Sequence, residues 1–323
     1  MLRLTPPGRQ RFVQAPHFEV TCGGAEANVA VTLAQLGASA AFVTKLPEND
    51  LARRAIDELR GLGVDTTLIV RGGERIGIYF LEQGASQRAG RVIYDRAHSA
   101  IAEALPADFG WSQILAGAKW LHWSGISPAL SPAAAAITSE ACMVAKRHGL
   151  TVSFDLNFRS RLWTHQAAGQ TLAPLMEHVD VCITSVEEAR AVFGLEVDDA
   201  APDRDEDAAR RLSERFGFKT VAFTQRIADS ADSTTWGAML LTGKKAFLSR
   251  RYEIGIVDRV GAGDSFTGAL IFALRRGDEP QRAIDFAVAA STLKHTIPGD
   301  YCRVSLEEVE ALAGGASGGR VQR

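Results

Sequence analysis

Asp258-Arg259-Val260-Gly261-Ala262-Gly263-Asp264-Ser265-Phe266 is the stretch of this sequence that decides the fold. An apolar pattern with helical spacing follows it through Leu270, Phe272 and Leu274 and stops at Gly277. The pattern therefore places Gly261 to Asp264 at the N-terminus of a helix. Unpaired backbone N–H groups at such a terminus bind anions, and glycine allows a phosphate to approach the backbone closely.

Asp264 adds a carboxylate to this predicted anion site. A carboxylate beside an anion hole suits phosphoryl transfer, because the carboxylate takes a proton from the hydroxyl while the N–H groups hold the phosphate charge. Taken alone, the same residues also describe a glycine turn with an aspartate helix cap, which is the commoner structure. The rest of the chain has to decide between the two.

Short apolar segments with β-character alternate along the chain with helical patterns. Helices are predicted from Asp50, as the capping residue, to Gly61 and from Ser131 to about His148. This alternation predicts an α/β fold with a mainly parallel sheet covered on both faces, whose ligands gather at the carboxyl ends of the strands. The predicted strands are 41–44, 120–123, 152–154, 179–183 and 220–223.

One region departs from this alternation. Residues 76–81 and 91–97 alternate apolar and polar side chains, and a loop over 83–90 that contains glycine separates them. This is the pattern of an antiparallel hairpin with one exposed face. We expect a small β-sheet that projects from the α/β body as a lid.

Composition excludes several classes of protein. The 323 residues are 46% apolar and 23% charged with a net charge of −2, so the basic footprint of a nucleic-acid-binding protein is missing. No run of about 18 apolar residues predicts a membrane span. The sequence contains no P-loop motif. Four scattered cysteines predict buried thiols in a reducing cytoplasm: Cys22, Cys142, Cys182 and Cys302.

The segment 258–266 resembles the C-terminal signature of the PfkB (ribokinase-like) carbohydrate kinases. Gly23-Gly24-Ala25-Glu26-Ala27-Asn28-Val29-Ala30 resembles their N-terminal signature. The resemblance implies one ribokinase-like domain over 1–323, with a central mainly parallel sheet, helices on both faces and a discontinuous β-lid at roughly 8–21 and 68–98. It also implies ATP and Mg²⁺ as cofactors, a small-molecule sugar as partner and a homo-oligomer.

Within that family, several segments look like the 2-keto-3-deoxygluconate kinases. A keto-acid sugar carries a carboxylate, which arginine is suited to bind through two hydrogen bonds. Arg96 on the lid hairpin and Arg159 after a core strand are the candidates, although a lone arginine is more commonly a surface salt-bridge partner. The segments are 75–82, 91–100, 154–159, 162–163 and 294–300.

The resemblance also implies the residues of the site. Asp264 would be the base, and the amides of Gly261, Ala262 and Gly263 the anion hole. Contacts with the substrate would come from Gly24, Asn28, Tyr79, Tyr94, Arg96, Arg159 and Asp300. Contacts with ATP would come from Asn157, Ser185, Glu188, Thr224, Arg226, Gly261 and Gly263.

Some of these residues have structural alternatives. Ser185 stands where many relatives have Asn, and with Glu188 it also forms a capping-box pattern. Glu188 would help to organise Mg²⁺, which the ATP phosphates would hold. Tyr79 and Tyr94 could instead be ordinary lid packing.

The leading hypothesis is ATP-dependent phosphorylation of the 6-hydroxyl of 2-keto-3-deoxygluconate, which gives 2-keto-3-deoxy-6-phosphogluconate. A fructokinase or another PfkB-family sugar kinase is the first alternative. The second is an inactive sugar- or nucleotide-binding homologue. Relatives usually begin with a strand that carries a Gly-Glu pair before the position of Leu2, so we expect about half of a central strand to be missing. Asp264 argues against an inactive protein, which has no need of a base.

Overall fold

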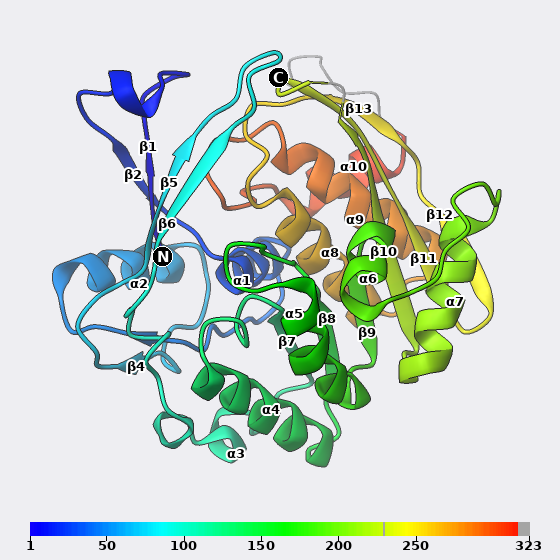
Figure 1. Cartoon of the computed structure of the whole chain (residues 1–323), viewed down its shortest axis with the longest axis horizontal. Helices are drawn as coiled ribbons and strands as arrows, with labels where there is room; N and C mark the ends of the chain where they lie inside the picture. The colour runs from blue at the N-terminus through cyan, green and yellow to red at the C-terminus, as the bar shows by residue number, and fades with distance from the viewer. Residues whose placement is uncertain (229, 316–323) are drawn as a thin grey trace.

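The computed structural model describes residues 1–228 and 230–315. Its centre is a twisted sheet in the order β12-β11-β10-β9-β8-β7, with β13 paired to β11 (Figure 1). The strands from β7 to β10 are parallel, and those beyond β10 are antiparallel. Their bounds are β7 Trp120–Ser124, β8 Thr151–Asp155, β9 Val181–Thr184, β10 Thr220–Ala228, β11 Ser233–Thr242, β12 Lys245–Leu248 and β13 Tyr252–Gly255.

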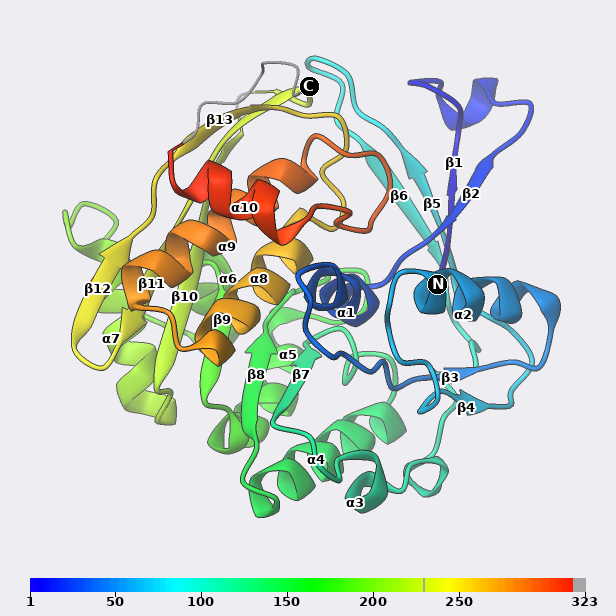
Figure 2. The same cartoon turned by 180° about the vertical axis from the view of Figure 1, so that it is seen from behind.

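Helices cover both faces of this sheet (Figures 1 and 2). One face carries α4 Pro132–Arg147, α5 His165–Leu172, α6 Val186–Phe193 and α7 Arg204–Phe216. The other carries α1 Ala25–Gln35, α8 Ala262–Arg276, α9 Pro280–Lys294 and α10 Leu306–Ala313. The remaining helices are α2 Asp50–Gly61, α3 Trp111–Ile114 and the 3₁₀ turns Phe12–Gln14, Pro106–Asp108 and Ala173–His178. The predicted α/β architecture is confirmed.

The two-residue period of the strands builds two hydrophobic cores. In β10, Val221 and Phe223 pack into the core under α4–α7, while Ala222 between them packs into the core under α8–α10. Successive side chains of a strand point to opposite faces, so a continuous apolar run serves both cores. None of the helices in the described ranges combines the length and apolar character needed to cross a membrane.

A separate four-stranded sheet projects from the body beside α1 (Figure 1). Its order is β2-β1-β5-β6, with bounds β1 Leu2–Thr5, β2 Glu19–Cys22, β5 Ile78–Glu82 and β6 Arg91–Asp95. The predicted hairpin forms its β5–β6 edge, where Tyr79 pairs with Tyr94. The small second sheet is thus confirmed.

Two details of the sequence analysis are wrong near the start of the chain. The strand after Met1 is no part of the central sheet, because β1 pairs with β2 and β5. Residues 41–44 form no strand ladder and make a single bridge, from Ala41 to Asp65. Their backbone bonds run only toward segment 65–70, and the ladder starts one residue later, where β3 Lys45–Leu46 pairs with β4 Val70–Arg71.

The capping residue of α2 also differs from the prediction. Asn49, not Asp50, is the N-cap, and its side chain accepts a hydrogen bond from the Ala52 N–H group at 3.0 Å. Asp50 is the first helical residue, where its negative charge interacts favourably with the positive end of the helix dipole.

Candidate active site

The turn before α8 has a shape that only glycine permits. Gly261 is the N-cap residue with φ +82°, and a Cβ atom there would lie 1.9 Å from the carbonyl oxygen of Asp300. A Cβ on Gly263 would meet no atom within 4 Å, so space is open beside the first turn. The first residues of α8 line an open cavity, as an anion site at a helix N-terminus requires.

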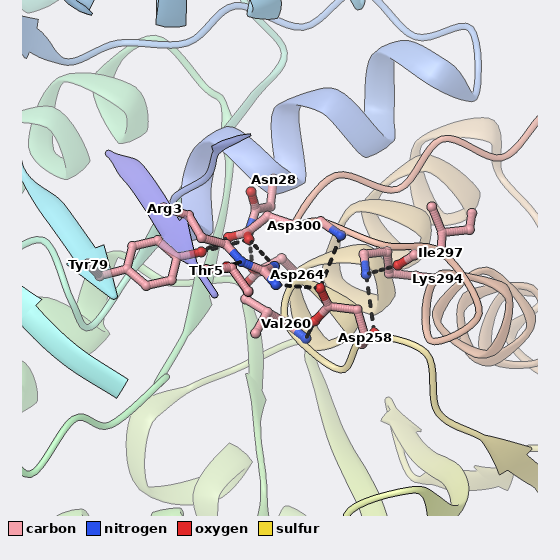
Figure 3. A network of polar contacts seen from close by, with 11 residues as sticks. Arg3, Thr5, Asn28, Tyr79, Asp258, Val260, Asp264, Lys294, Ile297 and Asp300 are labelled. Carbon is pink, nitrogen blue, oxygen red and sulfur yellow. Dashed lines mark hydrogen bonds and ion pairs between the residues drawn. The ribbon is translucent and has the colours of Figure 1, made fainter. Parts of the chain in front are cut away.

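Close packing of α1 on α8 brings Asn28 to Asp264. A side chain at Gly268 would clash with Thr32, since a Cβ would lie 2.8 Å from the Thr32 Cβ. At this short separation, the Asn28 amide Nδ2 donates to Asp264 Oδ2 at 2.6 Å (Figure 3). Burial raises the pKa of Asp264 to about 6, while the hydrogen bond from Asn28 acts in the opposite direction. A carboxylate with this pKa is ionised at neutral pH and is still a useful base.

A cavity of 1010 Å³ opens in front of Asp264. Asp155 at the end of β8, Thr184 at the end of β9 and Thr224 in β10 line it, so it lies where ligands of parallel sheets bind. The predicted residues that line this cavity are Gly24, Asn28, Tyr79, Tyr94, Arg96, Asn157, Arg159, Glu188, Thr224, Arg226, Gly261, Ala262, Gly263, Asp264 and Asp300.

Ser185 is the one predicted site residue outside this lining. It is the N-cap of α6, and its hydroxyl accepts a hydrogen bond from the Glu188 N–H group at 3.2 Å. The Glu188 carboxylate lies instead 3.5 Å from the hydroxyl of Thr184, toward the cavity. The alternative of a helix cap thus describes Ser185, and its contact with ATP stays a prediction.

Carboxylates of β8, α6 and α8 line the cavity: Asp155, Glu188 and Asp264. Burial raises the pKa of Asp155 well above its usual value, and the charges of Glu188 and Asp264 raise it further. Burial also raises the pKa of Glu188. These oxygens suit Mg²⁺, which binds proteins through one or two carboxylates, water and substrate phosphates. In the described ranges no three acidic, histidine or cysteine residues form a metal cage, so phosphates would supply the remaining ligands.

Arg96 and Arg159, which we call the open arginine pair, line the cavity and form no ion pair with a carboxylate in the described ranges. The same is true there of Arg226, Arg259 and Arg275. Arg96 follows β6, is 8% exposed and stacks over the Tyr94 ring at 4.1 Å. Its Nη2 atom is buried without a hydrogen-bond partner in the described part of the chain. Burial lowers the pKa of Arg96, and so does the nearby charge of Arg159. With Arg159 on the same cavity, the two guanidinium groups could bind an anionic ligand.

A second group of charges is fully paired. Arg3 donates to Asp258 Oδ2 at 2.6 Å and to Asp300 Oδ1 at 2.9 Å (Figure 3). The hydroxyl of Tyr79 also lies 2.6 Å from both oxygens of Asp300. With the buried Lys294, we call Arg3, Asp258, Asp300 and Lys294 the closed charge network. The Asp300 carboxylate is thus engaged by protein groups, and its contact with substrate stays a prediction.

Sequence reasoning missed several residues of the site. Arg3 belongs to no motif, and only the fold brings it to Asp258 and Asp300. Arg259 lines the cavity and, together with burial, lowers the pKa of Arg226. Glu26 lies inside the N-terminal glycine segment and accepts hydrogen bonds from Ser124 and Ser127, both at 2.7 Å. The position of Glu26 between Gly24 and Asn28, two predicted substrate contacts, was the feature of the sequence that could have indicated it.

An anion hole, a buried base and several arginines around one cavity are the groups that a kinase of small molecules requires. The model of the pfkB family carbohydrate kinases matches residues 3–302, so the chain belongs to that family. The family, the ribokinase-like fold and the carbohydrate kinase class expected from the sequence are confirmed.

Individual relatives agree with this assignment. The chain is 37% identical over 319 residues to a 2-dehydro-3-deoxygalactonokinase of Haloferax volcanii, covering 99% of this chain and 96% of that protein. It is 30% identical to a 2-dehydro-3-deoxygluconokinase of Thermoproteus tenax, covering 93% and 86%. A crystal structure of 2-dehydro-3-deoxygluconokinase from Thermotoga maritima is 51% identical with a TM-score of 0.96, covering 98% and 96%.

Proposed function

We propose that this protein transfers the γ-phosphoryl group of ATP to the 6-hydroxyl of 2-keto-3-deoxygluconate, which is 2-dehydro-3-deoxygluconate. The observation that carries the proposal is the open arginine pair on the same cavity as Asp264. A neutral sugar gives the buried guanidinium of Arg96 no anionic partner, whereas a sugar acid supplies a carboxylate. Relatives named for 2-dehydro-3-deoxy sugar acids support the same substrate class.

The residues of the chain have distinct roles in this reaction. Asp264 accepts the proton of the 6-hydroxyl as that oxygen attacks, and Asn28 orients the carboxylate through its 2.6 Å hydrogen bond. The N–H groups at the start of α8 stabilise charge on the transferred phosphoryl group. Bound Mg²⁺ would neutralise phosphate charge, with Glu188 and Asp155 placed to bind its water ligands. The product is 2-keto-3-deoxy-6-phosphogluconate.

The nucleotide would lie toward β10. Arg226 and Arg259 provide positive charge there, and Thr224 of β10 lines the cavity, as does Asn157 after β8. Asn157 adopts φ +40°, which is unusual for a residue other than glycine and is typical of functional sites. Because Arg226 lies in β10 and lines the cavity, we expect it to contact the phosphates of ATP.

The four-stranded sheet would close over the sugar acid, since it carries Tyr79, Tyr94 and Arg96.

The β6 edge of the four-stranded sheet exposes Val92 and Ile93, which suits contact with a second copy in a homo-oligomer. Four buried free thiols fit a cytoplasmic enzyme. Light scattering of wild type and Ile93→Lys tests the oligomer, which the substitution should weaken.

The experiment is a coupled ADP-release assay with a panel of acceptors, in which the phosphorylated product is identified by mass and NMR. We expect ATP- and Mg²⁺-dependent turnover with 2-keto-3-deoxygluconate and little with fructose. The 2-keto-3-deoxygalactonate epimer belongs in the panel because of the named Haloferax volcanii relative. Preference for fructose would contradict the sugar-acid assignment, and no turnover with any acceptor would favour an inactive binding protein.

A further inference from the structure

Lys294 is buried more completely than a lysine normally is. It is the last residue of α9, its side chain is 0% exposed, and it ranks among the largest fully buried side chains of the described residues. Lysine is almost never fully buried unless its charge has partners, because removing an ammonium group from water is costly. The cost of burying this ammonium group therefore has to be offset by interactions inside the protein.

The partners of this ammonium group are mainly backbone oxygens. Nζ donates to the carbonyl oxygen of Ile297 at 3.1 Å and to that of Asp258 at 3.3 Å (Figure 3). Burial lowers the pKa of Lys294, while the charges of Asp258 and Asp300 act in the opposite direction. Carbonyl oxygens beside carboxylates form the kind of surroundings in which proteins bind small cations.

The two carbonyl groups belong to the two segments that form the anion-hole turn. The His295 carbonyl accepts hydrogen bonds from the N–H groups of Val257 and Asp258, at 2.9 and 3.1 Å. The Asp258 carboxylate in turn accepts from the N–H groups of Val260, at 3.1 Å, and Gly299, at 3.0 Å. Lys294 therefore bridges segment 257–260 to segment 295–299, immediately before Gly261.

The charges of this region balance without any added ion. The closed charge network holds two cations, Arg3 and Lys294, and two carboxylates, Asp258 and Asp300. Loss of Lys294 would leave one buried negative charge in excess at the base of the turn. That charge would attract a cation from solution or let the turn move away.

We propose that Lys294 is a positioning residue whose ammonium group acts as a built-in cation, holding the turn before α8 in the shape that aims its N–H groups at the transferred phosphoryl group. This proposal rests on the proposed phosphoryl transfer and adds to it a cause for the shape of the anion hole. It also implies that the wild-type enzyme needs no monovalent cation at this position.

The first test uses the wild-type protein. Its acceptor-dependent kcat is measured with Mg²⁺ and with potassium, sodium, ammonium or tetramethylammonium chloride at equal ionic strength. We expect the same kcat in all four salts, because Lys294 fills the cation position. A kcat that collapses in tetramethylammonium and returns with potassium or ammonium would overturn the proposal.

The second test compares two variants. Lys294→Ala leaves room for a small cation, whereas Lys294→Met fills the space with an apolar chain of similar length. We expect kcat to fall on the order of a hundredfold in both, as misplacement of catalytic groups does. Ammonium ions should restore about tenfold in Lys294→Ala and nothing in Lys294→Met. Wild-type kcat in both variants would overturn the proposal, and so would equal loss without rescue when both remain folded.

Hydrogen exchange separates this inference from the proposed function. Peptides covering 257–265 should exchange about tenfold faster in Lys294→Met than in wild type, while peptides of β8 should not change. If wild type phosphorylates no sugar acid, the proposed function fails, and the exchange measurement still tests Lys294. Unchanged exchange in 257–265 would show that the ammonium group does not hold the turn. If neither variant folds, the salt series on wild type decides.

Discussion

Arg3 and Arg96 are both buried arginines of the same four-stranded sheet region, and they differ in what surrounds them. Arg3 is 3% exposed and its guanidinium binds Asp258, Asp300 and the hydroxyl of Thr5. Arg96 is 8% exposed, stacks on Tyr94 and has a buried nitrogen without a partner in the described residues. The pKa of Arg3 is raised above its usual value, and that of Arg96 is lowered.

The difference indicates that Arg3 maintains the structure around the site, whereas Arg96 is available to bind a ligand. In the closed charge network two carboxylates balance two cations: Arg3 binds both Asp258 and Asp300, and Lys294 donates to backbone carbonyl groups. In the open arginine pair, Arg96 has a buried nitrogen without a partner in the described residues, which is costly unless an anion binds there. Loss of a matched charge should therefore cost stability, and loss of an unmatched one should cost substrate binding.

The largest expected effect lies between the two regions, at the base. Asp264→Asn keeps the size of the side chain but cannot accept the hydroxyl proton, so kcat should fall about a thousandfold or more. Steady-state kinetics measures the loss. The melting temperature and circular dichroism should stay near wild type. An Asp264→Asn variant that retains most of its turnover would show that another group is the base.

Arg3→Met breaks the closed charge network and leaves two buried carboxylates short of a cation. We expect the free energy of unfolding to fall by about 3–5 kcal/mol, the usual effect of removing one partner of a buried ion pair. Urea denaturation measures it. Arg53→Met is the matched control, because Arg53 is 76% exposed and pairs with Asp57 on the surface. If both variants lose the same stability, Arg3 has no special role.

Substitutions in the open arginine pair should act on binding. Arg159→Met or Arg96→Met should raise the KM for 2-keto-3-deoxygluconate by about 10- to 100-fold, which corresponds to one charged hydrogen-bonding group. In Arg96→Met the free energy of unfolding should change little or rise, because a buried charge is removed. A variant that loses stability as Arg3→Met does, with unchanged KM, would remove the distinction between the two regions.

The smallest expected effect is on the pH profile. With a pKa of about 6, Asp264 is protonated as pH falls below 6, so kcat/KM should drop about tenfold per unit of pH on the acid side. Asn28→Ala removes the hydrogen bond that favours the charged carboxylate, which should shift the acid limb to higher pH. An acid limb near pH 4 in wild type would show that burial does not raise the pKa of Asp264.

The sequence predicted the features that short patterns encode. The glycine turn, the helix after it and the β5–β6 hairpin all follow from local chemistry, and they correspond to α8, β5 and β6. Residues 41–44 were less predictable, because an apolar run becomes a strand only where a neighbour pairs with it along its length. The same holds for β1, whose partners β2 and β5 fixed its sheet.

The site divides in the same way. The base, the anion hole and the open arginine pair could be named from motifs and from the charge that a sugar acid requires. Arg3 and Lys294 could not be assigned roles, because their partners lie about 255 and 36 positions away in the chain. The engagement of Asp300 by Arg3 and Tyr79 likewise depends on contacts between two strands of the four-stranded sheet and a distant loop.

Recognition of the substrate carboxylate by the open arginine pair is tested most directly by comparing 2-keto-3-deoxygluconate with its methyl ester. The ester keeps the reacting 6-hydroxyl and removes the negative charge. We measure kcat/KM for both acceptors with wild type and with the Arg96→Met/Arg159→Met double variant. We expect the kcat/KM of wild type to be about a hundredfold higher for the acid than for the ester, and this difference should nearly vanish in the double variant. Equal kcat/KM for acid and ester in wild type would contradict recognition of the carboxylate by the open arginine pair.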